Sequence, residues 1–245
     1  MACSAAGNLD LAIPNWVEPV RNNRVGAKSK GHKIHELIAD LITFQYETTK
    51  LDEEGNEVTS RVYKNGPKDL LYTAEILTYV SEIWSTRRFK VLSEEPMKAH
   101  WLDQPTDTTA DLVLYTQDEM HIFDWKVGKI QVDAIDNEQL LFYAATYGIL
   151  ASKAKQITVH ICQPWAGGME EWVITTERLK QFIDDAVEAQ RKVLRGDTTF
   201  GPSDHCTFCP ANPHSRGDKG GPFCPAMMQV LYPTTGTDEE AILNL

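Results

Sequence analysis

The sequence predicts a mixed α/β fold in which helices flank a central mixed β-sheet. Stretches with helical periodicity alternate along the chain with short β-branched-rich runs, and two of those runs face each other across a polar turn. The expected order is helix, helix, strands, helix, strand, helix. A chain of 245 residues, 42% of them hydrophobic, suffices for one such domain with a small appendage.

The first part of this order consists of two helices separated by a polar insertion. Apolar residues recur at helical spacing over 32–46, and a second helix fits 69–89. The segment 49–68 between them is rich in turn residues, which predicts a surface excursion. Two short strands are expected next, over 90–95 and 97–102.

The second part begins with a hairpin over 110–126. A helix is predicted over 137–150, with Asp136 as its N-cap, followed by a strand over 156–163 and a long helix over 175–195. After this helix the chain is rich in Gly, Pro, Cys and His, a composition that cannot build an apolar core of its own. We therefore expect a core domain over 1–200, irregular in its first 30 residues, and an appendage over 201–245.

Composition narrows the class of protein. The net charge is −11, which argues against a general nucleic-acid binder, although basic residues cluster locally. No run approaches the length of a membrane span, and no signal peptide is visible at the N-terminus, so a cytoplasmic protein with no membrane partner is expected. Five cysteines in such a protein favour metal or redox roles over disulfides.

The hairpin is the strongest sign of chemistry. Its two apolar runs flank a polar stretch over 116–119, and pairing about the middle of that stretch sets Asp111 opposite Asp124. Lys126 lies two residues further on and shares that face. Two facing carboxylates need positive charge between them, which predicts a site for a divalent cation and an anionic substrate. A solvated sheet face with chance acids is the alternative.

Two further candidates for cation ligands lie outside the hairpin. Glu94 and Glu95 are on the preceding strand, where one of them would complete the ligand shell; a surface acid pair is the alternative. His35 falls at the edge of the apolar stripe of the first helix. A neutral imidazole there would join the carboxylates on a metal, and half-buried packing is the alternative.

Gln139 and Tyr143 share one face of the predicted helix 137–150, because they are four residues apart. Their side chains would hold DNA or buttress Lys126. Alternatively, Gln139 completes a capping box with Asp136.

The cysteines form a second motif. Cys206 and Cys209 present two thiolates to one metal, and Cys224 lies within reach by a loop. A zinc site completed by a histidine and an iron–sulfur cluster of four thiolates are both open. The candidates for the fourth ligand are Cys3, Cys162, His205 and His214.

Together these motifs resemble the RecB-type branch of the PD-(D/E)XK nucleases, and most closely the small CRISPR-associated and phage-encoded RecB-like exonucleases. The resemblance spans about residues 31–225 and rests on the order of the motifs: Gly31 to His35, a glutamate, Ala110-Asp111, Asp124-Trp125-Lys126, Gln139 to Tyr143 and the C-terminal cysteines. It implies a restriction-endonuclease-like core and a metal-dependent DNA nuclease.

The resemblance also implies roles for individual residues. His35, Asp111, Asp124 and the main-chain carbonyl of Trp125 would bind Mg²⁺ or Mn²⁺, and Lys126 would be the catalytic lysine. The glutamate of the motif is Glu94 or Glu95, of which we favour Glu95. Gln139 and Tyr143 would position DNA.

For the cysteines, the resemblance implies a [4Fe–4S] cluster bound by Cys3, Cys206, Cys209 and Cys224, with the segment 1–30 packing toward it. The chain departs from the pattern in the long gap between Cys209 and Cys224. This gap contains His214, which keeps zinc open.

The expected function is metal-dependent exonuclease action on single-stranded or end-containing DNA, in recombination, repair or phage DNA metabolism. A structure-specific endonuclease and a non-catalytic metal-stabilised DNA-binding module are the alternatives. Contacts to the DNA backbone are expected from Lys28, Lys30, Lys33 and Lys129. Trp125 or Trp101 would stack on unpaired bases; burial of these side chains in the core is the alternative.

Overall fold

The computed structural model describes residues 25–43, 48–51, 57–60, 67–151, 153–154, 156–203, 206, 209, 211–212 and 224–227. The chain forms two compact units. One is Asn23–Asp185, and the other combines Met1–Asn22 with Ala186–Leu245. No helix of the described part is both long enough and apolar enough to cross a lipid bilayer.

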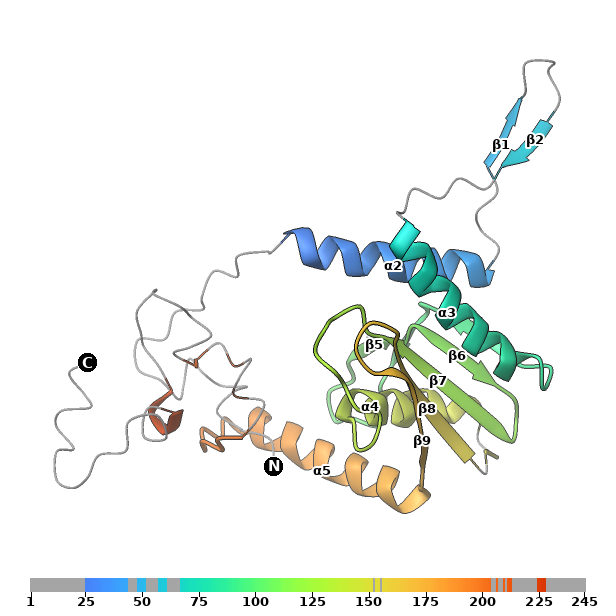
Figure 1. Ribbon diagram of the computed structural model, residues 1–245. Coiled ribbons are helices and arrows are strands. Elements are labelled where there is room, and N and C mark those ends of the chain that lie inside the picture. Colours follow the sequence, from blue (N-terminus) through green and yellow to red (C-terminus); the bar gives the residue numbers. More distant parts are fainter. Residues whose placement is uncertain are drawn as a thin grey trace. The chain divides into compact units, whose positions relative to one another are not determined.

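The first unit is a mixed α/β structure around a central sheet (Figure 1). Among the described residues this sheet has five strands in the order β3-β6-β7-β8-β9, and β7 and β8 are its parallel pair. The remaining neighbours are antiparallel. The strands are β3 (Lys90–Ser93), β6 (Leu112–Tyr115), β7 (Glu119–Trp125), β8 (Gln156–Gln163) and β9 (Gly168–Ile174).

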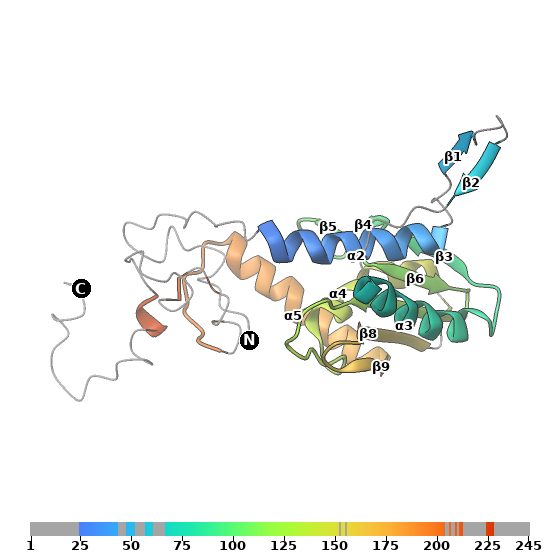
Figure 2. The ribbon, with the colours of Figure 1, turned by 45° about the horizontal axis from the view of Figure 1, so that its top comes forward.

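Helices α2 (Val25–Thr43) and α3 (Pro67–Trp84) cover one face of the sheet (Figures 1 and 2). Side chains alternate along β6 and β7, so every second residue points toward these helices. Leu112, Leu114 and Phe123 are fully buried there against apolar residues of both helices. The apolar stripe predicted for the first helix is therefore its packing face.

Helix α4 (Glu138–Tyr147) and the start of α5 (Thr176–Leu194) pack on the other face. The opposite set of strand residues, such as Val113 and Ile122, is buried against Leu141 and Ala144 of α4. A short two-stranded sheet of β4 (Pro96–Lys98) and β5 (Asp107–Thr109) lies beside it, and a second one pairs β1 (Thr48–Leu51) with β2 (Glu57–Ser60).

The predicted fold class is confirmed in its central part, a five-stranded mixed sheet flanked by helices. The strand over 156–163 is β8, residue for residue, and α5 matches the predicted last helix to within one residue at each end. The hairpin is also confirmed. Leu112 pairs with Phe123, so the register is centred where the sequence placed it.

Several element predictions are wrong. The N-cap of α4 is Asn137, whose side chain accepts from the N–H groups of Gln139 and Leu140; Asp136 lies outside the helix with a φ of 54°. The first helix, Val25–Thr43, begins earlier than predicted, and its predicted end over 44–46 lies outside the described residues. The strand predicted over 97–102 is β4, which ends at Lys98 because a turn follows.

Strands β1, β2, β5 and β9 were not predicted. Burial alternates in the second half of β9, where the half-buried Trp172 lies between the exposed Glu171 and Val173. Among the described strands, β9 pairs with β8 alone. An edge strand of this kind carries many polar residues, so its sequence lacks the apolar run of a central strand.

Candidate active site

The acids of the hairpin lie where β6 begins and β7 ends. Asp111 precedes Leu112, the first residue of β6, and Asp124 is the penultimate residue of β7. Asp111 is 8% exposed and Asp124 is 3% exposed. Two carboxylates buried this deeply need partners, because an unpaired buried charge is costly.

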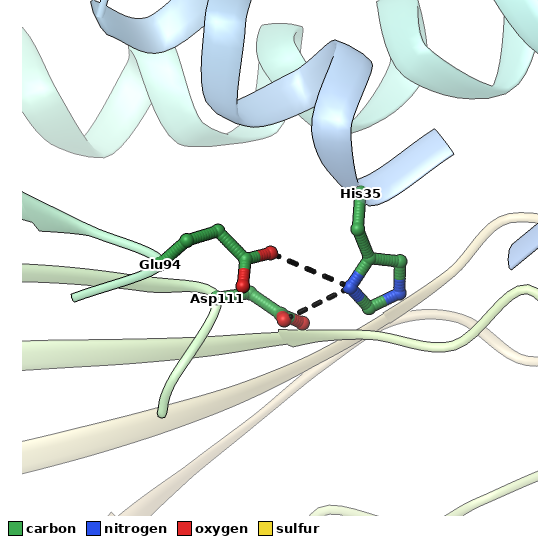
Figure 3. A group of neighbouring side chains, drawn as sticks. All are labelled: His35, Glu94 and Asp111. Atoms are coloured by element: carbon green, nitrogen blue, oxygen red, sulfur yellow. Dashed lines mark hydrogen bonds and ion pairs between the residues drawn. The ribbon is translucent and has the colours of Figure 1, made fainter. Parts of the chain in front are cut away.

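His35 of α2 and Glu94, which follows β3, meet Asp111 (Figure 3). The Nδ1 atom of His35 lies 3.0 Å from Asp111 Oδ1 and 3.6 Å from Glu94 Oε1. The ligand-type atoms of the three side chains all lie within 4.8 Å of one another. This group, the triad, combines residues separated by up to 76 positions in the sequence.

Of the two candidate glutamates, Glu94 is the one whose carboxylate lies in the triad, and a metal-binding role for Glu95 stays a prediction. Glu94 has a φ of 51°, a left-handed conformation that is unusual for a glutamate, and its N–H donates to the main-chain carbonyl of Asp111. This backbone turn at the end of β3 brings the Glu94 side chain to His35. The main-chain carbonyl of Glu95 instead accepts from the hydroxyl of Tyr147 at 2.7 Å.

Asp124, Lys126 and Gln139 form a second group, which we call the lysine clamp. Lys126 Nζ lies 2.7 Å from Asp124 Oδ2 and donates to Gln139 Oε1 at 2.7 Å. The amide nitrogen of Gln139 donates to Asp124 Oδ1 at 3.0 Å and to the Tyr143 hydroxyl at 2.6 Å. Gln139 thus buttresses the lysine, one of the alternatives that the sequence left open.

The main chain connects the clamp to the triad. The N–H of Trp125, which lies between Asp124 and Lys126, donates to Asp111 Oδ2 at 2.5 Å. Asp111 therefore uses one oxygen for His35 and the other for β7. The two groups form one contiguous site at this end of the sheet.

The site brings three carboxyl groups close together, and their pKa values and that of His35 reflect this. Burial raises the pKa of Asp124 to about 6, reinforced by the charge of Asp111 and opposed by Lys126. Burial also raises the pKa of Asp111, against the hydrogen bond from His35. Burial disfavours a charged His35, but its bonds to Asp111 and Glu94 outweigh burial and raise the His35 pKa to about 10. The acids thus favour a cation at the position of the imidazole.

The donor set fits a divalent cation of the Mg²⁺ or Mn²⁺ type. The triad offers two carboxylates and one imidazole at close range. Asp124 Oδ2 is buried with no hydrogen-bond partner among the described residues, although Lys126 Nζ lies 2.7 Å away. This contact is an ion pair, and a carboxylate oxygen has more than one lone pair, so Asp124 Oδ2 can accept a further ligand beside the ammonium group.

Tyr72 of α3 is a site residue that sequence reasoning missed. Its hydroxyl donates to the main-chain carbonyls of Lys126, at 2.8 Å, and Cys162, at 3.2 Å. The Tyr72 ring is fully buried, so in the sequence it reads as one more apolar position of the helix. Only the packing of α3 on the sheet reveals its contact with the backbone of the lysine.

A model of the family described as "Protein of unknown function (DUF2800)" matches residues 13–240. The chain belongs to the DUF2800 family.

Two solved structures are similar to this DUF2800 chain at low identity. One is named "Putative exonuclease" and comes from Eubacterium rectale; it is 10% identical, covers 88% of this chain and 82% of its own, and has a TM-score of 0.45. The other, the crystal structure of SSO0001, is 12% identical, covers 59% of this chain and 68% of its own, and has a TM-score of 0.34. TM-scores below 0.5 do not establish a common fold, so neither likeness carries an argument about the DUF2800 chain.

The cysteine motif of this DUF2800 chain lies in the second unit. Cys206 and Cys224 are buried, and Cys209 is half-buried. In the described part of the chain, one group of His, Cys, Asp or Glu residues has three ligand atoms within 4.8 Å of one another, and that group is the triad. The sulfur atoms of Cys206, Cys209 and Cys224 do not lie that close together. Cys3, His205 and His214 lie outside the described residues.

Of the other residues predicted to contact DNA, the two tryptophans pack inside the DUF2800 chain and two of the lysines are exposed. Trp125 is 2% exposed and belongs to the core, and Trp101 packs against Phe142 and Phe182. Lys33 and Lys129 are exposed. The side chains of Lys28 and Lys30 lie outside the described part, and Cys162 is buried in β8.

Proposed function

We propose that this protein is a metal-dependent nuclease that hydrolyses phosphodiester bonds in DNA. The observation that carries the proposal is the joining of the lysine clamp to the triad through the Trp125 N–H. Buried carboxylates that can hold a divalent cation lie beside a fixed ammonium group. This is the combination that phosphodiester hydrolysis requires, and the resemblance to RecB-type PD-(D/E)XK nucleases supports the same activity.

The candidate ligands are His35, Glu94, Asp111 and Asp124, together with the main-chain carbonyl of Trp125. A bound Mg²⁺ or Mn²⁺ would supply Lewis-acid activation of water and charge neutralisation at the phosphate. The chain itself contributes rigidity, since each of these ligands comes from a helix or strand or from the residues that flank one.

Lys126 is proposed as the catalytic cation. Its ammonium group is held between Asp124 and Gln139, and its side chain is 24% exposed, so a substrate can reach it. There it orients the attacking water by a hydrogen bond and offsets the charge that develops on the phosphate oxygens. Gln139 keeps the lysine in place, and Tyr143 holds the Gln139 amide from behind.

The proposed substrate is single-stranded or end-containing DNA, cut from an end. The net charge of −11 means that attraction to DNA must come from local positive groups rather than from the whole surface. Exposed Lys33 and Lys129 are such groups, with Lys28 and Lys30 as further candidates.

The decisive experiment compares Asp124→Asn and Lys126→Met with the exposed control variants Asp118→Asn and Lys153→Met. Linear single-stranded, linear duplex and covalently closed circular DNA are incubated with Mg²⁺ or Mn²⁺, with and without a chelator. The wild type and both controls should degrade linear DNA only when metal is present. The two site variants should lose at least about 100-fold in rate, the scale of a lost acid–base or electrostatic contribution.

The other outcomes are equally informative. Full activity in Asp124→Asn and Lys126→Met contradicts the site. Cutting of the closed circle makes the enzyme an endonuclease. If the wild type binds DNA but cleaves none of it under any metal condition, the protein is a non-catalytic DNA-binding module.

For the second unit we propose a [4Fe–4S] cluster held by Cys3, Cys206, Cys209 and Cys224, with Zn²⁺ as the alternative. The support is the pattern of the thiols in the sequence and the resemblance. Anaerobic purification followed by visible absorption and elemental analysis tests it. Iron and sulfide that are lost in Cys209→Ser support the cluster, zinc that is lost in the same variant reverses the choice, and a metal-free wild type contradicts both.

A further inference from the structure

Trp165 is an exposed tryptophan that packs on Tyr72, and the Tyr72 hydroxyl reaches the main-chain carbonyl of Lys126. Trp165 lies in the turn between β8 and β9 and is 39% exposed, whereas Trp125 is buried in the core. Tryptophan is highly buried on average, so a partly open indole beside a candidate active site calls for an explanation. We propose that Trp165 is a stacking platform for one unpaired nucleobase of the substrate strand.

Tyr72 connects Trp165 to the catalytic lysine. The two aromatic rings pack edge to face with centroids 4.7 Å apart, and the Tyr72 hydroxyl donates to the main-chain carbonyl of Lys126 at 2.8 Å. One side chain therefore separates the indole from the backbone of Lys126. In the proposed complex, a base on Trp165 and a phosphate at Lys126 come from the same strand.

Gln163 holds this turn and the loop that follows Lys126 together. Its side chain is 1% exposed and is fully used: the amide nitrogen donates to the carbonyls of Gly128 and Ile130, and the amide oxygen accepts from the N–H of Val132. Its own main-chain carbonyl accepts from the N–H groups at 166 and 167. The platform is therefore preorganised, which lowers the entropy cost of binding.

The turn and the loop also lie at the same end of the sheet. β7 and β8 are parallel and pair up to Trp125 and Cys162, so the segments that leave them emerge side by side (Figure 1). The loop after β7 exposes Lys129, three residues beyond Lys126. A cation for the phosphate and an aromatic ring for the base are the two elements of single-strand recognition.

The occupant is an unpaired base rather than a base pair. Inside a duplex both faces of each base are covered by its neighbours, so a stacking platform can take up a base only from a single strand or a frayed end. The inference rests on the proposed nuclease function and deepens it, because it selects single-stranded DNA as the form that enters the site.

The test uses Lys126→Ala protein, in which binding is measured without cleavage, and a labelled single-stranded oligonucleotide with one abasic residue placed at successive positions. At one position the missing base should weaken binding by about 5- to 150-fold, the range expected for one stacked base. Adding Trp165→Leu should abolish this penalty, whereas Trp165→Phe should keep most of it. Ile149→Ala, which alters an exposed apolar residue outside the site, should leave it unchanged.

The compared quantity is the ratio of affinities for intact and abasic DNA within one preparation, so a loss of folded protein cancels. The same abasic penalty in Trp165→Leu and in the parent, or no penalty at any position, overturns the platform. Failure of the nuclease proposal is distinct: wild-type protein then leaves all DNA intact with either metal. A wild type that cuts DNA while Trp165→Leu retains the penalty refutes only the platform.

Discussion

Asp111 makes two hydrogen bonds that no stretch of local sequence could supply. One oxygen accepts from His35, 76 residues earlier, and the other accepts from the N–H of Trp125. Asp124 is held by Lys126, two residues away, and by Gln139 from α4. At the residue scale, the two acids can stay buried because each accepts hydrogen bonds from its own set of donors. His35 offsets the negative charge of Asp111 and Glu94.

Glu94 and Glu95 provide a matched pair of variants at this scale. Glu94→Gln removes a carboxylate from the triad, so we expect Mn²⁺ affinity to fall at least about tenfold, the lower end of effects seen when metal sites lose supporting groups. Glu95→Gln alters the neighbouring carboxylate outside the triad and should leave affinity unchanged. Isothermal titration calorimetry with Mn²⁺ measures both. A larger loss in Glu95→Gln would restore the assignment that the sequence favoured.

At the element scale, the site depends on how α4 begins and how the segment before it is fixed. Asn137 caps the helix, and Gln139 lies in its first turn, so the cap sets where the buttress of Lys126 points. Between Lys126 and Asn137 the backbone follows a loop that the buried Gln163 binds at three points. Helix start and loop together hold the clamp.

Asn137→Ala tests the cap. Loss of an N-cap side chain costs about 1 kcal/mol, so the free energy of unfolding measured with urea should fall by that amount. Cleavage should slow as well, because the first turn that carries Gln139 is loosened. Asp136→Asn keeps a residue type that tolerates a left-handed backbone and should change stability by less than about 0.5 kcal/mol. Equal losses in both variants would argue that Asn137 is not the cap.

Gln163→Leu tests the loop anchor. The change removes three hydrogen bonds at a buried position, and we expect a loss of about 1–3 kcal/mol in the free energy of unfolding. Amide hydrogen exchange over 128–132 should become faster. Gln156→Leu, at the exposed start of the same strand, is the control and should leave that exchange as it is. Unaltered protection in Gln163→Leu would show that the loop is fixed by other contacts.

At the scale of the whole molecule, the sheet carries a second buried polar group on the α3 side. His160 of β8 is fully buried, stacks on Phe123 with ring centroids 4.3 Å apart, and contacts His121 at 3.0 Å and the Tyr79 hydroxyl at 2.9 Å. Burial, together with the charge of His121, lowers the pKa of His160 from 6.5 to about 3. The folded protein therefore keeps this imidazole neutral.

The free energy of unfolding should therefore decrease at acid pH because of His160. In the unfolded chain the group takes up its proton near pH 6.5, but in the folded chain only near pH 3. Between these values the unfolded state binds more protons, so the contribution of His160 to stability falls as the pH decreases, by up to about 1.4 kcal/mol per pH unit.

His160→Gln isolates this term, because Asp124 has a raised pKa and contributes in the opposite direction at acid pH. We expect the stability difference, wild type minus His160→Gln, to shrink steadily as urea unfolding is measured from pH 7 to pH 4. A constant difference across this range would show that His160 titrates alike in both states.

Much of the fold could be predicted from the sequence, because the periodicity of apolar residues and the spacing of turn residues are visible within short segments of the chain. The alternation of the hairpin and the polar turn in its middle set the register that faces Asp111 with Asp124, and the period of β8 is readable without any partner. The edge strand β9 was missed, because strand pairing there compensates for weak apolar patterning. Asp136 and Asn137 are both favourable N-cap residue types, so only the backbone and its hydrogen bonds identify Asn137 as the cap.

The sequence by itself determined the fold class, the facing acids with Lys126, and the candidacy of His35 and Gln139, since residue type and periodicity carry that information. Only the tertiary structure decided that Glu94 rather than Glu95 meets His35, and that Tyr72 and Gln163 hold the backbone around Lys126. It also decided which of the described tryptophans is exposed, namely Trp165. These depend on a left-handed residue at the end of a strand and on the packing of helices against strands distant in sequence, neither of which is encoded in the spacing of neighbouring residues.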